Sequence, residues 1–120
     1  MKKILIVDDE PNIVMTLEYT FKKSNYEVFI ARDGQEALDI LKTNFPDVII
    51  LDIMMPMVDG FATLEQIRKD ANLQHTKVMF LSAKNKESDI EKGLALGADA
   101  YMTKPFSIKK VVEKVEELFG

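Results

Sequence analysis

The chain contains no cysteine. Disulfide bonds and metal sites with thiolate ligands are therefore excluded, and we expect a protein of the reducing cytoplasm. The apolar stretch after Lys2-Lys3 already ends at Asp8, which is too short for a signal peptide. No other stretch approaches the roughly 20 apolar residues that a membrane span requires, so we expect no membrane partner.

Signatures of nucleic-acid and nucleotide binding are also missing. No run of Lys and Arg is longer than two residues, and the formal net charge is −4. The sequence therefore predicts no direct contact with nucleic acid. Neither G-x-x-x-x-G-K-[ST] nor G-x-G-x-x-G occurs, which argues against the common nucleotide-binding folds.

Short apolar runs alternate with segments of helical spacing, and the length suits one domain over residues 1–120. The expected strands are Ile4–Val7, Glu27–Ala31, Asp47–Leu51, Lys77–Leu81 and Asp99–Met102. Helical spacing between and after them comes with expected N-terminal caps at Asp33, Asp59 and Ser107. Five strands alternating with five helices predict a doubly wound α/β fold, in which helices cover both faces of a parallel sheet.

The fourth expected helix has the weakest apolar stripe. Its core positions are essentially Ile90 and Leu94, among charged and polar neighbours, and Gly97 marks its end. An element that buries so little apolar surface opens more easily than its neighbours. We therefore expect this helix to be the most loosely held.

Carboxylates follow two of the most apolar strands. Asp8-Asp9 come directly after Ile4–Val7, and Asp52 ends the run that includes Val48 and Leu51. Ligands of open parallel sheets bind beyond the carboxyl ends of the strands, so we expect these three acids at one edge. Like charges gather in this way with a cation or a shared proton to offset their repulsion.

Such a cluster favours a hard cation with oxygen ligands. Mg2+ is the expected cation, because substrate phosphate oxygens usually complete its coordination. A carboxylate beside such an ion can attack a phosphoryl group and form an aspartyl phosphate. Ser82 and Lys104 follow the fourth and fifth strands and supply a hydroxyl donor and a mobile positive charge. Together these residues indicate phosphoryl transfer to Asp52.

The order and spacing of the motifs resemble the receiver domain of two-component response regulators. The motifs are Asp8-Asp9, Asp52 with Met55-Pro56 and Asp59-Gly60, Ser82-Ala83-Lys84, Gly97-Ala98-Asp99 and Lys104-Pro105-Phe106. Each motif is weak alone, but together they are specific and cover essentially the whole chain. The resemblance implies a flavodoxin-like fold with five parallel strands in the order 2-1-3-4-5.

The resemblance also assigns roles at the phosphorylation site. Asp52 would be the phosphoacceptor. Asp8 and Asp9 would hold Mg2+ directly or through water, together with Asp52 and the main-chain carbonyl of Met54.

Further roles concern the response to phosphorylation. Ser82 and Lys104 would bind the phosphoryl oxygens. Tyr101 would be the switch aromatic, which turns inward as Ser82 moves. The resemblance also implies a cis peptide bond between Lys104 and Pro105.

Some positions depart from the patterns common in the family. The residues two positions beyond the phosphoacceptor and beyond the Ser/Thr line the path of the hydrolytic water in the family, and here they are Met54 and Lys84. A thioether is a poor hydrogen-bond partner, so we expect a long-lived phosphoryl group. Ala100 and Lys110 stand where receivers that dimerise usually have acids, which leaves a homodimer on phosphorylation open.

The resemblance implies a signalling switch rather than an enzyme. A histidine kinase or phosphotransfer protein would phosphorylate Asp52. The face formed by the fourth helix, fifth strand and fifth helix would then control an output protein or effector domain. Two alternatives stay open: a docking module that does not depend on phosphorylation, and a Mg2+-dependent aspartyl phosphohydrolase. The phosphohydrolase would need a second aspartate at the position of Met54.

Overall fold

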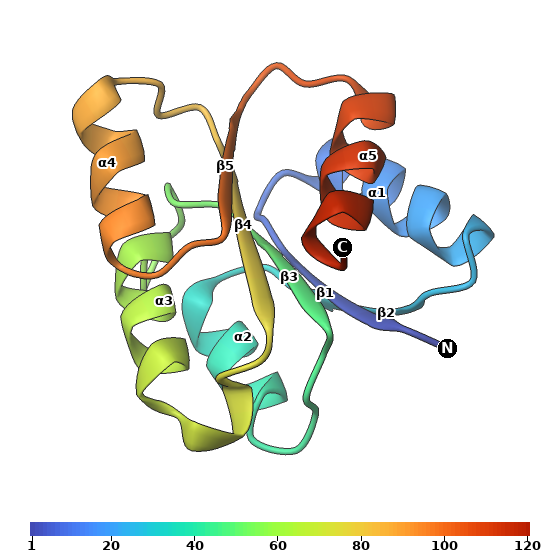
Figure 1. The fold of residues 1–120 in the computed structure, drawn as a ribbon, viewed down its shortest axis with the longest axis horizontal. Coiled ribbons are helices and arrows are strands. Elements are labelled where there is room, and N and C mark those ends of the chain that lie inside the picture. Colours follow the sequence, from blue (N-terminus) through green and yellow to red (C-terminus); the bar gives the residue numbers. More distant parts are fainter.

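Five parallel strands form one sheet in the computed structural model, which describes residues 1–120 (Figure 1). The strands are β1 (Lys3–Val7), β2 (Glu27–Ala31), β3 (Val48–Leu51), β4 (Lys77–Ser82) and β5 (Ala100–Thr103). Their spatial order is β2-β1-β3-β4-β5, and every neighbouring pair is parallel. The expected doubly wound fold and its strand order are confirmed.

Two strands begin one residue later than the sequence predicted. Asp47 and Asp99 lie just before β3 and β5, and each uses its side chain to bond a neighbouring strand. The carboxylate of Asp47 accepts a hydrogen bond from the Lys3 amide at 2.7 Å, and that of Asp99 accepts one from the Val78 amide at 2.8 Å. These acids thus satisfy N–H groups at the amino end of the sheet.

Helices cover both faces of the sheet. They are α1 (Pro11–Lys23), α2 (Gly34–Ile40), α3 (Gly60–Lys69), α4 (Glu87–Ala95) and α5 (Ile108–Leu118), with a short 3-10 helix, η1, at Ala71–Leu73. α1 and α5 lie on one face, and α2, α3 and α4 lie on the other (Figure 1). None of these helices combines the length and the apolar character needed to cross a membrane.

The two faces explain why the central strands are apolar at consecutive positions. In β1, Leu5 and Val7 pack in the cluster that includes α2 and α3, whereas Ile4 and Ile6 pack in the cluster that includes α1 and α5. All four side chains are fully buried. A strand covered on both sides has no solvent-facing position for a polar residue.

Three helices begin at the caps that the sequence predicted. The carboxylates of Asp33 and Asp59 accept hydrogen bonds from helix amides at 2.8 and 2.9 Å, and the hydroxyl of Ser107 accepts one at 3.4 Å. Such caps satisfy N–H groups that have no partner within the helix. Each cap lies on the side of the sheet where the parallel strands end, so it helps to fix the surroundings of the site.

α4 packs through a glycine and not through the leucine that the sequence predicted. Gly93 is its buried residue, and a Cβ atom there would lie 2.9 Å from the Phe80 ring and 3.1 Å from the Tyr101 ring. This close approach leaves Ile90 half-buried and turns Leu94 outward, with 46% of it exposed. The prediction that Leu94 is a core residue is therefore wrong, although α4 buries as little as expected.

Candidate functional site

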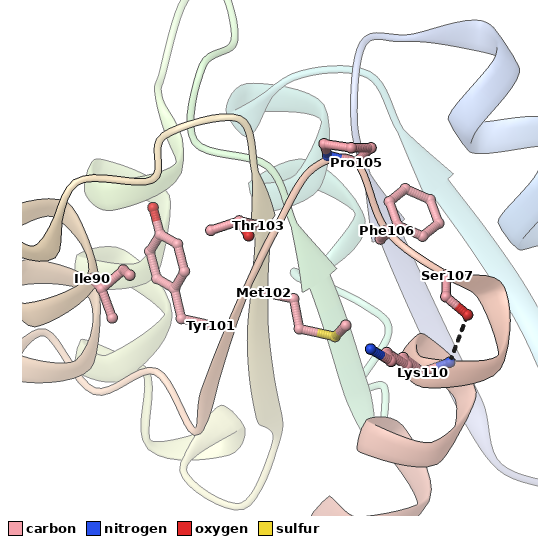
Figure 2. A pocket seen from close by; sticks show the side chains of 8 residues that line it. All are labelled: Ile90, Tyr101, Met102, Thr103, Pro105, Phe106, Ser107 and Lys110. Carbon is pink, nitrogen blue, oxygen red and sulfur yellow. Dashed lines mark hydrogen bonds between the residues drawn. The ribbon is translucent and has the colours of Figure 1, made fainter.

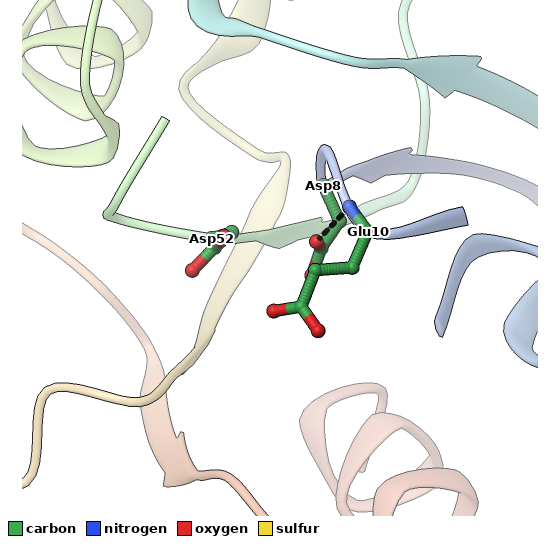
Figure 3. Close-up of side chains that lie close together, drawn as sticks. All are labelled: Asp8, Glu10 and Asp52. Carbon is green, nitrogen blue, oxygen red and sulfur yellow. Dashed lines mark hydrogen bonds between the residues drawn. The ribbon is translucent and has the colours of Figure 1, made fainter. Parts of the chain in front are cut away.

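Asp8 and Asp52 lie side by side at the carboxyl end of the sheet (Figure 3). They follow the adjacent strands β1 and β3, whose last residues, Val7 and Leu51, are paired. The Asp52 amide donates a hydrogen bond to the Val7 carbonyl at 2.9 Å, and the Asp8 amide donates one to Ala31 at 3.1 Å. Both acids are only 3% exposed. The sheet thus fixes together two of the three carboxylates that the strand ends were expected to gather.

Lys104 brings an ammonium group to these carboxylates from the loop after β5. Its Nζ lies 3.0 Å from Asp8 Oδ2 and 3.7 Å from Asp52 Oδ2, and its side chain is only 10% exposed. The Lys104 amide donates a hydrogen bond to the Ser82 carbonyl at 2.8 Å, which continues the pairing of β4 with β5. The Lys104–Pro105 bond is cis, as the resemblance implied.

Glu10 completes the cluster and was not predicted from the sequence. Its Oε1 accepts a hydrogen bond from Lys104 Nζ at 2.9 Å, and its amide donates one to Asp8 Oδ1 at 2.9 Å. Carboxylate oxygens of Asp8, Glu10 and Asp52 lie within 4.8 Å of one another (Figure 3). The available signal was the run of three acids at residues 8–10, but that run does not say which acid turns toward Lys104.

Asp9 lies apart from this group. It is exposed, and it is not among the acids whose oxygens gather within 4.8 Å. It borders a small cavity of about 110 Å³ next to Asp8, with Pro11, Val14 and Arg32 as the other lining residues. A role for Asp9 in holding a metal ion, directly or through water, stays a prediction.

Asp52 ionises less readily than a free aspartate. Burial raises the pKa of Asp52 to about 6, and the charges of Asp8 and Asp9 act in the same direction. The Lys104 ammonium and the Ile53 amide, which donates to Asp52 Oδ1 at 2.8 Å, oppose this shift. Burial also raises the pKa of Asp8. Both acids therefore lie where negative charge is poorly stabilised.

The cluster carries more negative than positive charge. Burial acts to lower the pKa of Lys104, but the hydrogen bonds with Glu10 and Asp8 and the charge of Asp52 raise it overall. This single ammonium group faces three carboxylates. Several carboxylate oxygens in one place are the donor set that hard cations such as Mg2+ prefer. The residues present thus fit a divalent cation.

Ser82 and Tyr101 contact the same residue of the loop between β4 and α4. Ser82 is the last residue of β4 and is fully buried, and its hydroxyl accepts a hydrogen bond from the Lys84 amide at 3.3 Å. The Tyr101 hydroxyl donates a hydrogen bond to the Lys84 carbonyl at 2.7 Å. Lys84 therefore links the two residues that the resemblance assigns to a coupled movement.

Tyr101 also borders a groove between α4 and α5 (Figure 2). The groove has a volume of about 450 Å³ and is lined by residues of α4, β5 and the start of α5. Ile90 and Met102 contribute apolar surface, and Lys110 contributes a charge. This groove lies on the face that the resemblance assigns to the interaction with an output partner.

Met54 lies in the loop from β3 to α3, and 58% of it is exposed. The loop is tight because α3 begins very close to the strand: a Cβ atom on Gly60 would lie 2.2 Å from the Asp52 carbonyl oxygen. Ile53 is buried and anchors the loop, which leaves the Met54 side chain in solvent. The role of the Met54 main-chain carbonyl as a metal ligand stays a prediction.

Residues 4–116 match the family described as the response regulator receiver domain. The chain belongs to this family. The resemblance stated from the motifs is confirmed, and the acidic cluster at the ends of β1 and β3 is that of a receiver domain in a two-component response regulator.

The receiver assignment is supported by individual relatives. The chain is 45% identical over 117 residues to the alkaline phosphatase synthesis transcriptional regulatory protein PhoP of Bacillus subtilis, covering 98% of the chain and 48% of PhoP. It therefore spans about half the length of this curated relative. The receiver domain of the Francisella response regulator 1452 is 37% identical, with a TM-score of 0.91 over 99% of this chain and 97% of that one. The chemotaxis response regulator CheY4 of Vibrio cholerae is 30% identical, with a TM-score of 0.93 over 98% of both chains.

Proposed function

We propose that residues 1–120 form one cytoplasmic receiver domain that acts as a phosphorylation-driven switch in a two-component phosphorelay. A histidine kinase or phosphotransfer protein would supply the phosphoryl group, and Asp52 would accept it. The observation that carries this proposal is the position of Asp52, a 3% exposed carboxylate whose Oδ2 is 3.7 Å from the ammonium group of Lys104.

The same cluster supports a requirement for Mg2+. Asp8, Asp52 and the main-chain carbonyl of Met54 would hold the ion, with Asp9 as a further ligand directly or through water. A divalent cation bound there would supply positive charge next to the phosphoryl oxygens. The excess of carboxylates over ammonium groups in the cluster supports this need for a cation.

The transfer step uses the Asp52 carboxylate as a nucleophile. An Asp52 oxygen attacks the phosphorus atom, a new O–P bond forms, and the bond from phosphorus to the donor's histidine nitrogen breaks. The electron pair of that bond stays with the histidine. Catalysis of such a transfer consists mainly of positioning and of stabilising charge, and Lys104 and Ser82 would bind the phosphoryl oxygens. The chain therefore acts as a switch rather than as an enzyme with a turnover substrate.

The response would reach the output face through the loop that follows β4. Ser82 would move toward the phosphoryl group. Its bond to the Lys84 amide and the bond of Lys84 to the Tyr101 hydroxyl support a coupled movement of Tyr101. The result is a shift between two populations of the face formed by α4, β5 and α5. This face would bind an output protein or effector domain, or a second copy of the chain, and not nucleic acid.

Labelling with an acyl phosphate and Mg2+ tests the phosphoacceptor directly. The wild type should gain the mass of one phosphoryl group, and Asp52→Ala should gain none. Asp39→Asn is a matched control, because Asp39 is exposed on α2 and pairs only with other exposed residues of that surface. Labelling of Asp52→Ala at the wild-type level, or no labelling of the wild type, would refute the proposal.

Coupling is tested separately at Lys104. Lys104→Ala should still accept a phosphoryl group, because the nucleophile is intact, but the chemical shifts of α4 and β5 should no longer change on labelling. A Lys104→Ala protein whose α4 and β5 signals still move as in the wild type would show that Lys104 does not transmit the signal.

A further inference from the structure

Glu10 holds the ammonium group that the proposed function assigns to the phosphoryl group. Lys104 Nζ lies 2.9 Å from Glu10 Oε1 and 3.0 Å from Asp8 Oδ2, but 3.7 Å from Asp52 Oδ2. The first two are short contacts between charged groups, and the contact with Glu10 is a hydrogen bond, whereas the third is an ion pair without a short contact. In this state Lys104 is therefore bonded to Glu10 and Asp8 and not to the phosphoacceptor.

The two partners of this contact differ in their freedom to move. The Lys104 side chain is 10% exposed, whereas that of Glu10 is 57% exposed. The main chain of Glu10 is fixed, because its amide donates a hydrogen bond to Asp8 Oδ1 and the following Pro11 begins α1. An exposed carboxylate regains its hydration when it leaves a partner, but a buried ammonium group must find another anion. Glu10 is thus the partner that can be displaced.

We propose that Glu10 is a positioning residue that acts as an internal anion on Lys104. In the resting protein the short contact with Glu10 holds the ammonium group beyond hydrogen-bond distance of Asp52 Oδ2, at 3.7 Å, and a phosphoryl group on Asp52 takes the place of Glu10. No covalent bond to Glu10 forms or breaks. This inference rests on the proposed function, because the competing anion is the phosphoryl group of Asp52. Its consequence is that Glu10 opposes the active state and sets how readily the switch responds.

Two substitutions separate this contact from the simple presence of a negative charge. Glu10→Gln removes the charge and keeps the length of the side chain. Glu10→Asp keeps the charge but is one methylene shorter, which withdraws the carboxylate from Lys104. Glu65→Gln is a matched control for the loss of one acid, because Glu65 is exposed on α3 and makes no side-chain hydrogen bond or ion pair.

The experiment is a titration with beryllofluoride, a phosphoryl mimic, at saturating Mg2+, followed by amide NMR signals of the full chain. Both Glu10→Asp and Glu10→Gln should bind the mimic about fivefold more tightly than the wild type, in line with an ion pair that has one exposed partner. Glu65→Gln should bind as the wild type does. Thermal unfolding of each variant checks that the fold is intact.

Every other outcome overturns a defined part of the proposal. Equal affinities of the wild type and both Glu10 variants would show that Glu10 does not compete. Tighter binding by Glu10→Gln alone would assign the effect to charge and not to the contact. Weaker binding by either variant would show that Glu10 helps to hold the cation or the anion. A wild type that binds no beryllofluoride would refute the proposed function itself.

A second readout needs neither Mg2+ nor a phosphoryl mimic. The side-chain ammonium signal of Lys104, observed with isotope-labelled lysine, reports its hydrogen-bond partners in the resting protein. This signal should shift in Glu10→Asp and stay in place in Glu65→Gln. An unchanged Lys104 signal in Glu10→Asp would overturn the proposed contact even if the affinity for beryllofluoride had changed.

Discussion

Two ionic clusters lie at opposite ends of the sheet, and their charges are balanced differently. At the amino end, Arg68 Nη2 is 3.0 Å from Asp99 Oδ2, and the same guanidinium donates to the carbonyls of Gly97 at 3.0 Å and Thr76 at 2.9 Å. The same Asp99 oxygen also accepts the Val78 amide. At the carboxyl end, by contrast, one ammonium group faces three carboxylates.

This difference in charge balance distinguishes a cluster that stabilises the fold from one that is suited to a chemical reaction. The Arg68 cluster pairs one cation with one anion and uses its remaining groups on backbone atoms, so it ties α3 to the loop between α4 and β5. The Lys104 cluster keeps an excess of buried negative charge, which lowers the stability of the folded state. The unbalanced end is therefore where a cation and a phosphoryl group can change the energy most.

The largest expected effect on stability is at the amino end of the sheet, where the charges of Arg68 and Asp99 balance. Arg68→Ala should lower the free energy of unfolding by about 2 to 3 kcal/mol, because several hydrogen bonds of a charged group are lost and their acceptors remain. Urea unfolding measures this change. Arg68→Lys is the control: it keeps the charge but not the planar set of donors, and it should recover only part of the loss. A change in Arg68→Ala below about 0.5 kcal/mol would mean that the cluster is not structural.

Neutralising an acid should have opposite effects on the free energy of unfolding at the two ends of the sheet. The pKa of Asp52 is about 6 in the folded protein against an ordinary value of 3.8. The folded state therefore binds this proton more tightly, and stability decreases as the pH rises from 3.8 to about 6. Asp52→Asn should remove this penalty and raise the free energy of unfolding by about 2 kcal/mol at neutral pH with a chelator present.

Urea unfolding at several pH values tests whether Asp52→Asn raises the free energy of unfolding. The gain from Asp52→Asn should shrink as the pH falls below about 6 and should vanish below 3.8, where the aspartate is protonated in both states. Asp99→Asn is the comparison at the balanced end, and it should lower stability because Arg68 loses its anionic partner. A destabilised Asp52→Asn protein would contradict the view that the carboxyl end carries an unfavourable excess of charge.

Mg2+ should reduce the difference in charge balance between the two ends of the sheet. A ligand that binds only the folded state at about ten times its Kd adds about 1.4 kcal/mol to the free energy of unfolding, and a bound cation should also lower the pKa of Asp52. Thermal unfolding with and without Mg2+ measures the gain. The gain should be retained in Asp39→Asn and largely lost in Asp52→Asn. Equal stabilisation of both variants would place the cation elsewhere.

The smallest expected effect concerns the lifetime of the phosphoryl group. Under the proposed function, the Met54 thioether would offer the hydrolytic water no good hydrogen bond. Met54→Asn should therefore lose phosphate about fivefold faster, the equivalent of one modest hydrogen bond. Met57→Asn is a matched control in the same loop: Met57 is 83% exposed and has a φ of 68°, a region that asparagine tolerates. Decay of the phosphorylated proteins is measured directly. Equal or slower loss from Met54→Asn would contradict the idea.

Most of the fold could be predicted because its signals are local. Buried strands such as Val48–Leu51 need consecutive apolar residues, and the caps at Asp33, Asp59 and Ser107 need short polar side chains. The packing of α4 was mispredicted, because the approach of Gly93 to Phe80 and Tyr101 depends on residues distant in the sequence.

The candidate site, like the fold, could be predicted from the sequence only in part. The strand ends were enough to predict that Asp8, Asp52 and Lys104 lie together, since parallel strands end at one edge. The same argument placed Asp9 with them, which is not where its carboxylate lies. The sequence also determined which groups are present, namely acids, a hydroxyl and an amine without any thiol. Only the tertiary structure decided that Glu10 and not Asp9 turns to Lys104, because the direction of a side chain in a loop depends on the partners that the completed fold places within reach.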